Sequence, residues 1–274
     1  MASPELTDPS AARVRRLRGL ARRASRQEQG RFLVEGAQAV REALVAAREG
    51  RATLHELITA VDARDRYPEL VDLAADAGVP VVTAAESVLA SLAGTVTPQG
   101  LVAVADCVDL PLDAVLKRRP RLVAVLADVR DPGNAGSVIR AADAAGAGAV
   151  IFAGNSVDPY NGKAVRASVG GIFHLPIVTG VTVTDAVSAV HAARLRVLIA
   201  DGSGETDLDH LAPRGELAYP TAWVFGNEAW GVPPDVLALA DAVVRIPIYG
   251  KAESLNLATA AALCLYASAR AQHA

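Results

Sequence analysis

The stretch DVRDPGNAGSVIRAADAAGAGAVIF, residues 128–152, places a turn rich in Asp, Pro, Gly and Asn between an apolar run and a helical pattern. The run before it, LVAVLADV at 122–129, is almost wholly apolar, and a further apolar run, AVIFAG, follows at 149–154. Strand, helix and strand in this order are typical of a parallel sheet, because a helix returns the chain before the next parallel strand pairs. The stretch therefore predicts an α/β domain.

The same alternation continues to the C-terminus. Uninterrupted apolar strands that alternate with helices favour a parallel sheet covered on both faces. The glycines Gly146 and Gly148 follow a helix and precede a strand, so they indicate a helix end and a turn rather than a dinucleotide-binding fingerprint. We predict strands at 172–178, 196–202, 221–227 and 242–248, and helices at 161–168, 183–194, 233–240 and 254–272.

The N-terminal part has its own alternating pattern over about a hundred residues, enough to fold alone. Strands are predicted at 31–36, 54–60, 79–84 and 100–108, and helices at 37–50, 68–78 and 86–94. A segment with two prolines and a basic cluster follows, which we interpret as a linker, with a short helix at LDAVLKR as the alternative. The predicted division is a first domain at 1–107, a linker at 108–120 and a second domain at 121–274.

Composition excludes several classes of protein. The chain has 274 residues, of which 51% are hydrophobic and only 4% aromatic. Cys107 and Cys264 lie in apolar surroundings far apart in sequence, which predicts buried thiols in a reducing compartment. The five His lack metal-ligand spacing, no secretory leader pattern is present, and the longest apolar run is too short to span a membrane. We expect a soluble cytoplasmic protein with no metal and no membrane partner.

Charge is distributed unevenly. Residues 1–31 hold eight Arg and three acids, a net +5, so the remainder of a chain of net charge −3 carries −8. A basic arm on an acidic body predicts contact with a polyanion. The alternative is a solvated helix face, since the chain prefers Arg throughout, with 24 Arg among its 27 basic residues.

Three predicted strand ends carry Asn together with Gly or Ser. In the first, Asn134 stands where a helix N-cap is expected, and Arg140 follows on nearly the same helix face. In the third, Ser254 is predicted to be an N-cap, with Asn256 two residues later. Ligands in open α/β sheets bind beyond the carboxyl ends of strands, so these turns predict one shared site. For each turn considered alone, the alternative is that these residues only cap a helix or form a turn and bind no ligand. The second turn is FGNEAWGV at 225–232.

Taken together, DPGNAGSVIRAADAAG, FGNEAWGV and IPIYGKAESLNLATAAALCLY resemble, in order, the three motifs of the SpoU (TrmH-type) RNA ribose 2′-O-methyltransferases of the SPOUT superfamily. RFLVEG and TVTPQGLVAVAD resemble that family's substrate-binding domain, which is similar to ribosomal protein L30e. The resemblance implies an L30e-like α/β domain followed by a parallel-sheet α/β domain tied in a trefoil knot. It also implies a homodimer.

The resemblance further implies S-adenosylmethionine (AdoMet) as cofactor and RNA as partner. Ribosomal RNA, in particular 23S, is the favoured substrate, and tRNA is the second. A non-catalytic RNA-binding protein that keeps the fold is the alternative from another class. The site residues carried over are, for catalysis, Arg140, Asn134, Glu228, Ser254 and Asn256; for the cofactor, Gly226, Asn227, Ile246, Ser254, Leu255 and Asn256; and for RNA, Arg15, Arg16, Arg22, Arg23, Lys163 and Arg166.

Two roles remain open for Arg140. The resemblance implies that this residue activates the ribose 2′-hydroxyl. An Arg side chain is effectively always protonated, so the alternative is a fixed cation that binds the adjacent phosphate and stabilises the developing alkoxide.

Overall fold

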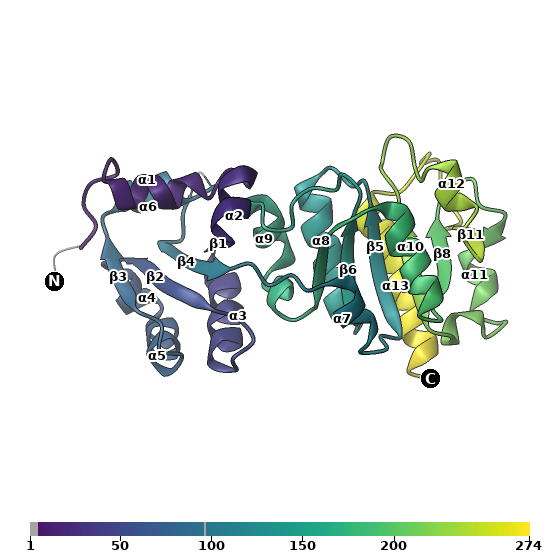
Figure 1. Cartoon of the computed structure of the whole chain (residues 1–274), viewed down its shortest axis with the longest axis horizontal. Coiled ribbons are helices and arrows are strands. Elements are labelled where there is room, and N and C mark those ends of the chain that lie inside the picture. Colours follow the sequence, from purple (N-terminus) through teal and green to yellow (C-terminus); the bar gives the residue numbers. More distant parts are fainter. Residues whose placement is uncertain (1–4, 96) are drawn as a thin grey trace. The chain divides into compact units, whose positions relative to one another are not determined.

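The computed structural model describes residues 5–95 and 97–274, which form two compact units (Figure 1). The first unit comprises residues 1–108 together with 158–174, and the second comprises 109–157 and 175–274. These boundaries differ from those predicted from the sequence, which place residues 158–174 in the second domain and residues 108–120 in a linker.

The first unit is built on a four-stranded mixed sheet of order β1-β4-β2-β3. Strand β4 (Leu101–Asp106) pairs antiparallel with both β1 (Arg31–Glu35) and β2 (Leu54–Ala60), and β2 pairs parallel with β3 (Val81–Ala84). Helices α1 (Ala12–Gly19) and α6 (Glu86–Leu92) lie on one side of this sheet, and α3 (Ala37–Arg48) and α5 (Pro68–Asp76) lie on the other (Figure 1). Two short helices, α2 (Arg23–Gln29) and α4 (Ala63–Arg66), also belong to this unit.

The Arg-rich arm is a folded part of this unit. Val14, Leu17 and Leu20 are buried, so α1 packs by an apolar stripe while its arginines face outward. Arg26 is itself buried, donates to the carbonyls of Leu20 and Ala21, and forms an ion pair of 2.6 Å with Asp158.

Segment 158–174 joins the first unit through aromatic packing. The Phe32 ring on β1 lies 4.7 Å from the Tyr160 ring and 5.9 Å from the Phe173 ring, measured between centroids. The segment contains α9 (Gly162–Ser168) and a 3₁₀ turn at Gly171–Phe173. The strand predicted at 172–178 is therefore wrong in its first half, and β7 (Ile177–Val181) begins only after this packing ends.

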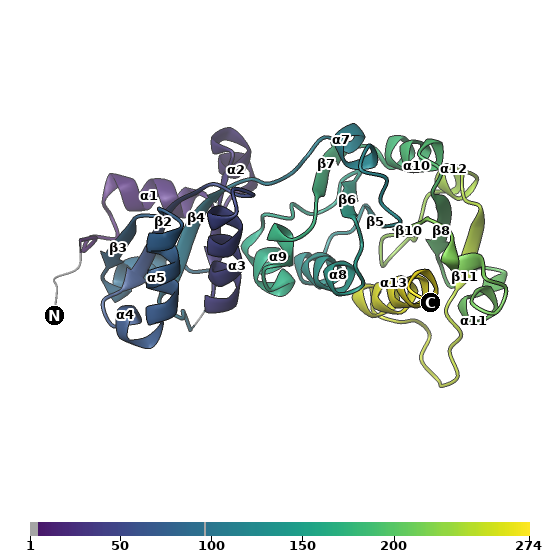
Figure 2. The same cartoon turned by 90° about the horizontal axis from the view of Figure 1, so that it is seen from below.

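The second unit contains a seven-stranded parallel sheet of order β7-β6-β5-β10-β8-β11-β9. Helices α8 (Pro132–Ala144) and α13 (Leu257–Gln272) lie on one face, and α7 (Leu112–Leu116), α10 (Val183–Ala192) and α12 (Pro234–Leu237) lie on the other (Figure 2). A short helix, α11, spans Leu208–Leu211, and a 3₁₀ turn spans Glu216–Ala218. The remaining strands are β5 (Leu122–Ala127), β6 (Ala149–Ala153), β8 (Arg196–Ala200), β9 (Thr206–Asp207), β10 (Thr221–Phe225) and β11 (Ala242–Arg245).

Strand register brings the sequence motifs to one edge. Central strand β10 pairs in parallel with β5 and β8, and β8 pairs in parallel with β11, so the turns that follow these strands lie at the same edge of the sheet. The expected linker contributes to this unit, since α7 buries Val115 in the core beneath α10. Trp223 of β10 is fully buried and donates from Nε1 to Ser268 Oγ of α13 at 2.9 Å.

Two predicted caps differ from those observed. Helix α8 begins at Pro132 with Asp131 as N-cap, so Asn134 lies inside the first helical turn. The fixed φ of a Pro suits the first helical position, and the Asp131 carboxylate accepts from Asn134 N at 2.8 Å. Helix α13 is capped by Asn256 rather than Ser254, because Asn256 Oδ1 accepts from the backbone N of Ala258 and Thr259. Strands β5 and β11 also end two and three residues earlier than predicted.

Candidate functional site

The turn after β5 is held to the turn after β10 by a buried amide. Asn227 Nδ2 donates to the Asp128 carbonyl at 2.8 Å, and Asn227 is only 5% exposed. Asp128 adopts a φ of 56°, an uncommon left-handed conformation for a residue other than glycine. Its carboxylate accepts from Asn155 N at 2.7 Å, which stabilises that conformation. The turns after β5 and β10 are thereby joined by a hydrogen bond from a side chain to the backbone.

Polar side chains from all three motifs meet in one hydrogen-bonded network. Asn134 Nδ2 donates to Glu228 Oε1 at 2.7 Å, and Asn256 Nδ2 donates to Asn134 Oδ1 at 2.9 Å. The Asn256 cap assigns both amide orientations, because the oxygen that accepts from the α13 backbone leaves Nδ2 as the donor to Asn134. We call these three residues the Asn134–Glu228–Asn256 network. It connects residues up to 122 positions apart in sequence.

A cavity of about 510 Å³ lies beside this network, at the carboxyl ends of β8, β10 and β11. Its lining combines apolar side chains with backbone and a few polar groups, as small-molecule sites generally do. All the residues predicted to bind the cofactor line it: Gly226, Asn227, Ile246, Ser254, Leu255 and Asn256.

Gly226 permits the close backbone approach that shapes this cavity. A Cβ at Gly226 would lie 2.5 Å from the carbonyl carbon of Gly231 and 2.6 Å from a methyl group of Val232. Asn227 and Gly231 exchange two backbone hydrogen bonds, of 3.0 and 2.8 Å, which close the turn. A side chain at position 226 would open this turn or fill the cavity.

Arg140 lies apart from the cavity lining. Its side chain is exposed on α8, and it has no hydrogen-bond or ion-pair partner within residues 5–95 and 97–274. The structure thus brings together four of the five residues predicted for catalysis, Asn134, Glu228, Ser254 and Asn256, and leaves Arg140 as an unpaired cation on the adjoining helix.

The residues predicted to bind RNA belong to the first unit and differ in their surroundings. Arg15, Arg16, Arg22 and Arg23 are exposed, and none of them forms an ion pair at contact distance with a carboxylate of the described residues. Lys163 is exposed in the first turn of α9. Arg166 instead forms an ion pair of 2.7 Å with Glu35, which is buried, and donates to the Gly94 carbonyl. Its charge is neutralised within the protein.

Two cavity residues that directly follow β8 were not predicted from the sequence. Asp201 and Gly202 line the cavity, and the Asp201 carboxylate accepts from the backbone and hydroxyl of Ser203. The signal was available, because an Asp-Gly pair forms the carboxyl end of the strand predicted at 196–202. Asp128 was missed because its role depends on a backbone contact with Asn227.

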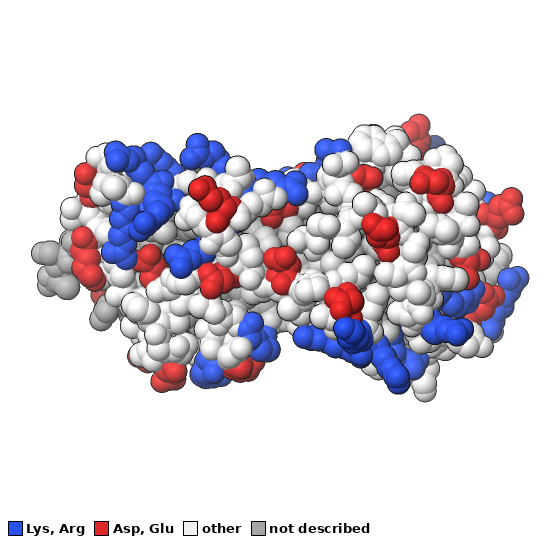
Figure 3. Space-filling model, in the orientation of Figure 1, with Lys and Arg blue, Asp and Glu red and all other residues white. Residues whose placement is uncertain are grey.

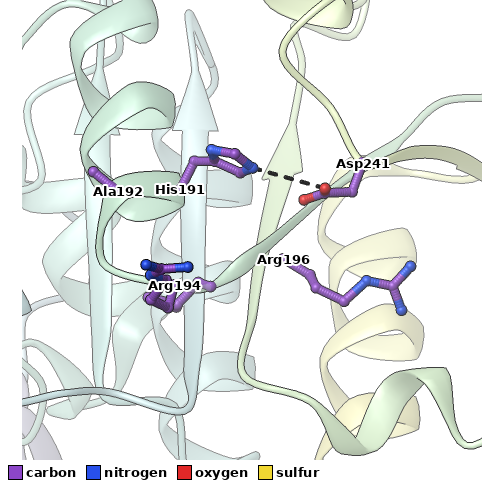
Figure 4. Close-up of a pocket in the computed structure, with 6 residues that line it drawn as sticks. His191, Ala192, Arg194, Arg196 and Asp241 are labelled. Carbon is purple, nitrogen blue, oxygen red and sulfur yellow. Dashed lines mark ion pairs between the residues drawn. The ribbon is translucent and has the colours of Figure 1, made fainter.

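A second cavity, of about 450 Å³, lies at the opposite ends of the strands, where α10 leads into β8 (Figure 4). His191 Nε2 and Asp241 Oδ1 are 3.7 Å apart across it, and Asp241 also accepts from Val197 N. Ligands of open α/β sheets bind at the carboxyl ends of strands, so we assign the functional site to the first cavity.

Comparison with known proteins agrees with this geometry. Residues 121–266 match the SpoU rRNA Methylase family, and residues 11–103 match the MRM3-like substrate binding domain. The chain belongs to the SpoU rRNA methylase family. Within this family it is 33% identical to the 23S rRNA (guanosine(2553)-2′-O)-methyltransferase of Bacillus subtilis, over 86% of this chain and 87% of that protein.

Solved structures of the family share the architecture. An AdoMet-bound rRNA methyltransferase from Sinorhizobium meliloti is 28% identical, with a TM-score of 0.81 over 97% of each chain. The SpoU methyltransferase AviRb from Streptomyces viridochromogenes, solved with AdoMet, is 31% identical, with a TM-score of 0.80 over 95% of this chain and 98% of that one.

Residues 5–95 and 97–274 show neither a metal-binding cluster nor a membrane-spanning helix. No cluster of three or more His, Cys, Asp or Glu side chains is arranged to hold a metal ion in this part of the chain. Its helices likewise include none with the length and apolar character needed to cross a membrane.

Proposed function

We propose that this SpoU-family protein transfers a methyl group from AdoMet to a ribose 2′-hydroxyl of ribosomal RNA. The observation that carries the proposal is the Asn134–Glu228–Asn256 network beside the cavity, because it unites all three motifs at one strand edge. The names of relatives favour 23S rRNA, since proteins 33% and 36% identical to this chain are named 23S rRNA 2′-O-methyltransferases. A cytoplasmic location follows from that substrate.

The cavity suits AdoMet in size and chemistry. Its volume of about 510 Å³ lies within the range of roughly 300–1,000 Å³ common for small-molecule sites. Phe225, Ile246 and Leu255 provide apolar surface, and the glycine turn at Gly226 exposes backbone that can hydrogen-bond a polar ligand. When bound, AdoMet supplies an electrophilic methyl group. Ser254 and Asn256 would hold the loop around it.

The chain's own residues have distinct roles in this proposal. Asn134 and Asn256 hold Glu228 in place, so that a polar group stands ready beside the substrate ribose. Arg140 stands on the same helix as Asn134 and has no carboxylate partner among the described residues, so its full charge remains available to RNA. It acts either on the 2′-hydroxyl itself or as a fixed cation for the phosphate and the developing alkoxide.

The first unit is proposed to bind RNA through an Arg surface. Figure 3 shows basic side chains gathered over α1, and Arg15, Arg16, Arg22 and Arg23 are exposed there and on the adjoining turn into α2. Unpaired guanidinium groups bind phosphate and release counterions, which contributes affinity without sequence preference. Of the six residues that the family resemblance suggests for RNA binding, we retain these four and Lys163. Arg166 is left out because it forms an ion pair with Glu35.

We also propose a homodimer built on α13. Leu263 and Tyr266 on this helix are each 45% exposed and border a groove of about 960 Å³ together with Tyr249, which is 88% exposed. An apolar surface of this kind favours burial against a protein partner. The trefoil knot remains a prediction from the family resemblance.

Methyl transfer from labelled AdoMet to 23S rRNA tests the proposed activity. We expect purified protein to bind AdoMet, to label unmodified 23S rRNA, and to produce one new 2′-O-methyl site when modified positions are mapped with and without the protein. Labelling of tRNA and not of 23S rRNA would show that tRNA, the second candidate, is the substrate. AdoMet binding with no RNA labelled, or no AdoMet binding, would favour the non-catalytic RNA-binding alternative.

A further inference from the structure

Two side chains in the turns beside the Asn134–Glu228–Asn256 network have no role in the function proposed above. Trp230 lies two residues after Glu228, and its side chain is 60% exposed. The chain contains only two Trp, and the other, Trp223, is fully buried in the sheet. Arg130 lies four residues before Asn134, in the turn after β5, and is also exposed. Single exposed apolar residues are common, so exposure alone decides nothing.

The turn that carries Trp230 is closed by hydrogen bonds. Asn227 and Gly231 are joined by backbone bonds in both directions, and Asn227 Oδ1 accepts from Ala229 N at 2.9 Å. The same Asn227 anchors the turn to the Asp128 carbonyl, two residues before Arg130. Trp230 is therefore presented to solvent from a turn with a defined shape, so little ordering entropy is lost when the ring binds a partner.

Arg130 and Trp230 contact each other across the two turns. The guanidinium carbon of Arg130 lies over the Trp230 ring, 6.0 Å from its centroid, at the distance of a cation–π contact. Arg130 has no carboxylate partner within residues 5–95 and 97–274, so its charge is not neutralised by the protein. Neither residue lines the cavity proposed for AdoMet, so the cofactor would leave both uncovered.

An exposed indole beside an unpaired guanidinium has the chemistry of a site for unpaired RNA. Bases released from a helix stack on aromatic rings and on Arg planes, and the adjacent phosphate attracts the cation. A paired base is already stacked on both faces, so such a platform selects single-stranded segments. The two turns also carry Asn134 and Glu228, so a base held on Trp230 lies near the ribose that these residues position.

We propose that Trp230 and Arg130 form a stacking platform for an unpaired RNA base at or next to the methylated nucleotide. The proposal rests on the proposed function for the identity of the substrate. The platform makes Trp230 a positioning residue that holds the RNA, and it explains why a chain with 4% aromatic residues places an indole in solvent at this turn.

Intrinsic fluorescence tests the platform without any methyl transfer. The probe is a single-stranded oligoadenylate of about 12 nucleotides, compared with an abasic ribose-phosphate oligomer of the same length and charge. We expect oligoadenylate to quench the Trp230 emission and shield it from acrylamide, and the abasic oligomer to do neither. Trp230→Phe should abolish the response, because the remaining Trp223 is buried. An equal response to both oligomers would overturn the platform, since phosphate alone would then account for binding.

Steady-state kinetics on 23S rRNA supply the second test. Trp230→Ala should raise the KM for RNA by about 5- to 150-fold, the usual effect of losing one stacked base, and leave the AdoMet Kd unchanged. Trp230→Phe should restore most of the affinity, because Phe keeps a stacking face. Arg130→Gln should also raise the KM. The matched control is Tyr219→Ala, since Tyr219 is 59% exposed and precedes β10, at the opposite end of that strand from Trp230.

Three results separate the possible failures. An unchanged KM in Trp230→Ala overturns the platform, and so does loss of dimer in sedimentation of that variant, because the ring would then serve a subunit contact. If the wild-type protein transfers no methyl group, the proposed function fails, yet the fluorescence comparison still decides whether Trp230 stacks RNA bases.

Discussion

Asn134 is the residue that joins the three motifs. Its amide donates to Glu228 and accepts from Asn256, while its own backbone N–H is held by Asp131. The side chain at position 134 uses one donor and one acceptor at the same time, and this explains why an amide is required there. An ionised carboxylate has no donor for Glu228, and a hydroxyl would have to make both bonds from a single oxygen, whereas the amide makes them from two separate atoms.

Asn134→Asp tests this assignment. Asp keeps an oxygen that accepts from Asn256, but it replaces the donor to Glu228 with a second carboxylate 2.7 Å away. The two charges repel, so Glu228 should leave its position and methyl transfer should fall by roughly 10- to 100-fold, the usual cost of misplacing a site group. The measurement is kcat at saturating AdoMet, with the thermal midpoint as control for folding. An unchanged kcat would mean that Glu228 needs no orientation by Asn134.

Arg140 is an exposed cation on helix α8, the helix that also carries Asn134. Arg140→Ala should reduce methyl transfer by about a hundred- to a thousandfold while AdoMet binding stays close to normal, because Arg140 does not line the cavity. Arg140→Lys separates the two roles. Lys keeps the charge but loses the planar fork, so partial activity favours the fixed cation and no activity favours a geometric or proton-accepting role. Full activity in Arg140→Ala would mean that Arg140 is an ordinary exposed helix residue with no role in methyl transfer.

Helix α13 shows how one element serves two surfaces. Ala261, Cys264, Leu265 and Ser268 are buried against the sheet, whereas Leu263 and Tyr266 are half-exposed on the outer side. The apolar pattern almost all round this helix predicts a subunit interface, with Leu263 and Leu265 as the two positions expected to report on it. The structure assigns Leu265 to the core, so only the outer positions report on a partner.

Leu263→Glu should dissociate the proposed homodimer. A charge at a desolvated interface position is costly, whereas at an exposed position it is nearly neutral. Sedimentation at micromolar concentration is the measurement. Leu239→Glu is the matched control, because Leu239 is 39% exposed and follows α12 on the other face of the sheet. A wild-type protein that sediments as a monomer would remove the dimer from the proposal.

The thiols give a further prediction for α13. Burial raises the pKa of the Cys264 thiol far above its ordinary value, and Cys107 is only half-buried, contrary to the expectation that both are buried. A raised pKa disfavours the reactive thiolate at every accessible pH, so Cys264 should resist alkylation from pH 7 up to about pH 9 in the folded protein. Quantitative labelling with and without denaturant is the measurement. Rapid native labelling of Cys264 would show that α13 opens readily.

At the scale of the whole molecule, charge and chemistry are divided between the two units. The unpaired arginines of the arm lie in the first unit, and the cavity and its polar network lie in the second. The arm cannot be removed as a tail, since α1 buries Val14 and Leu17 and Arg26 is paired with Asp158. A test of its role in RNA affinity therefore has to change charge and leave the fold intact.

Replacing Arg15, Arg16, Arg22 and Arg23 by Gln should weaken RNA binding and flatten its dependence on salt. Each lost phosphate contact reduces the slope of log K against log salt by about 0.7 for single strands, so four contacts reduce it by roughly 3. The matched control replaces Arg118, Arg119, Arg194 and Arg214, which are exposed in the second unit and carry the same total charge. Equal slopes in the two variants would assign RNA binding to general charge rather than to the arm.

Most elements, and the edge of the sheet at which the site forms, were predictable from local sequence. Apolar runs and helical periodicity depend on neighbouring residues, so the turns after β5, β10 and β11 were predictable from them. The individual residues predicted to line the cofactor cavity, from Gly226 to Asn256, came from the family resemblance. Tertiary structure alone decided which residues pair across the fold. Asn134 meets Asn256, 122 residues away, Arg166 is neutralised by Glu35, and segment 158–174 packs on Phe32 of the first unit. These outcomes depend on contacts between distant segments, which local sequence patterns do not predict. Such packing and hydrogen bonds form only when the chain has folded.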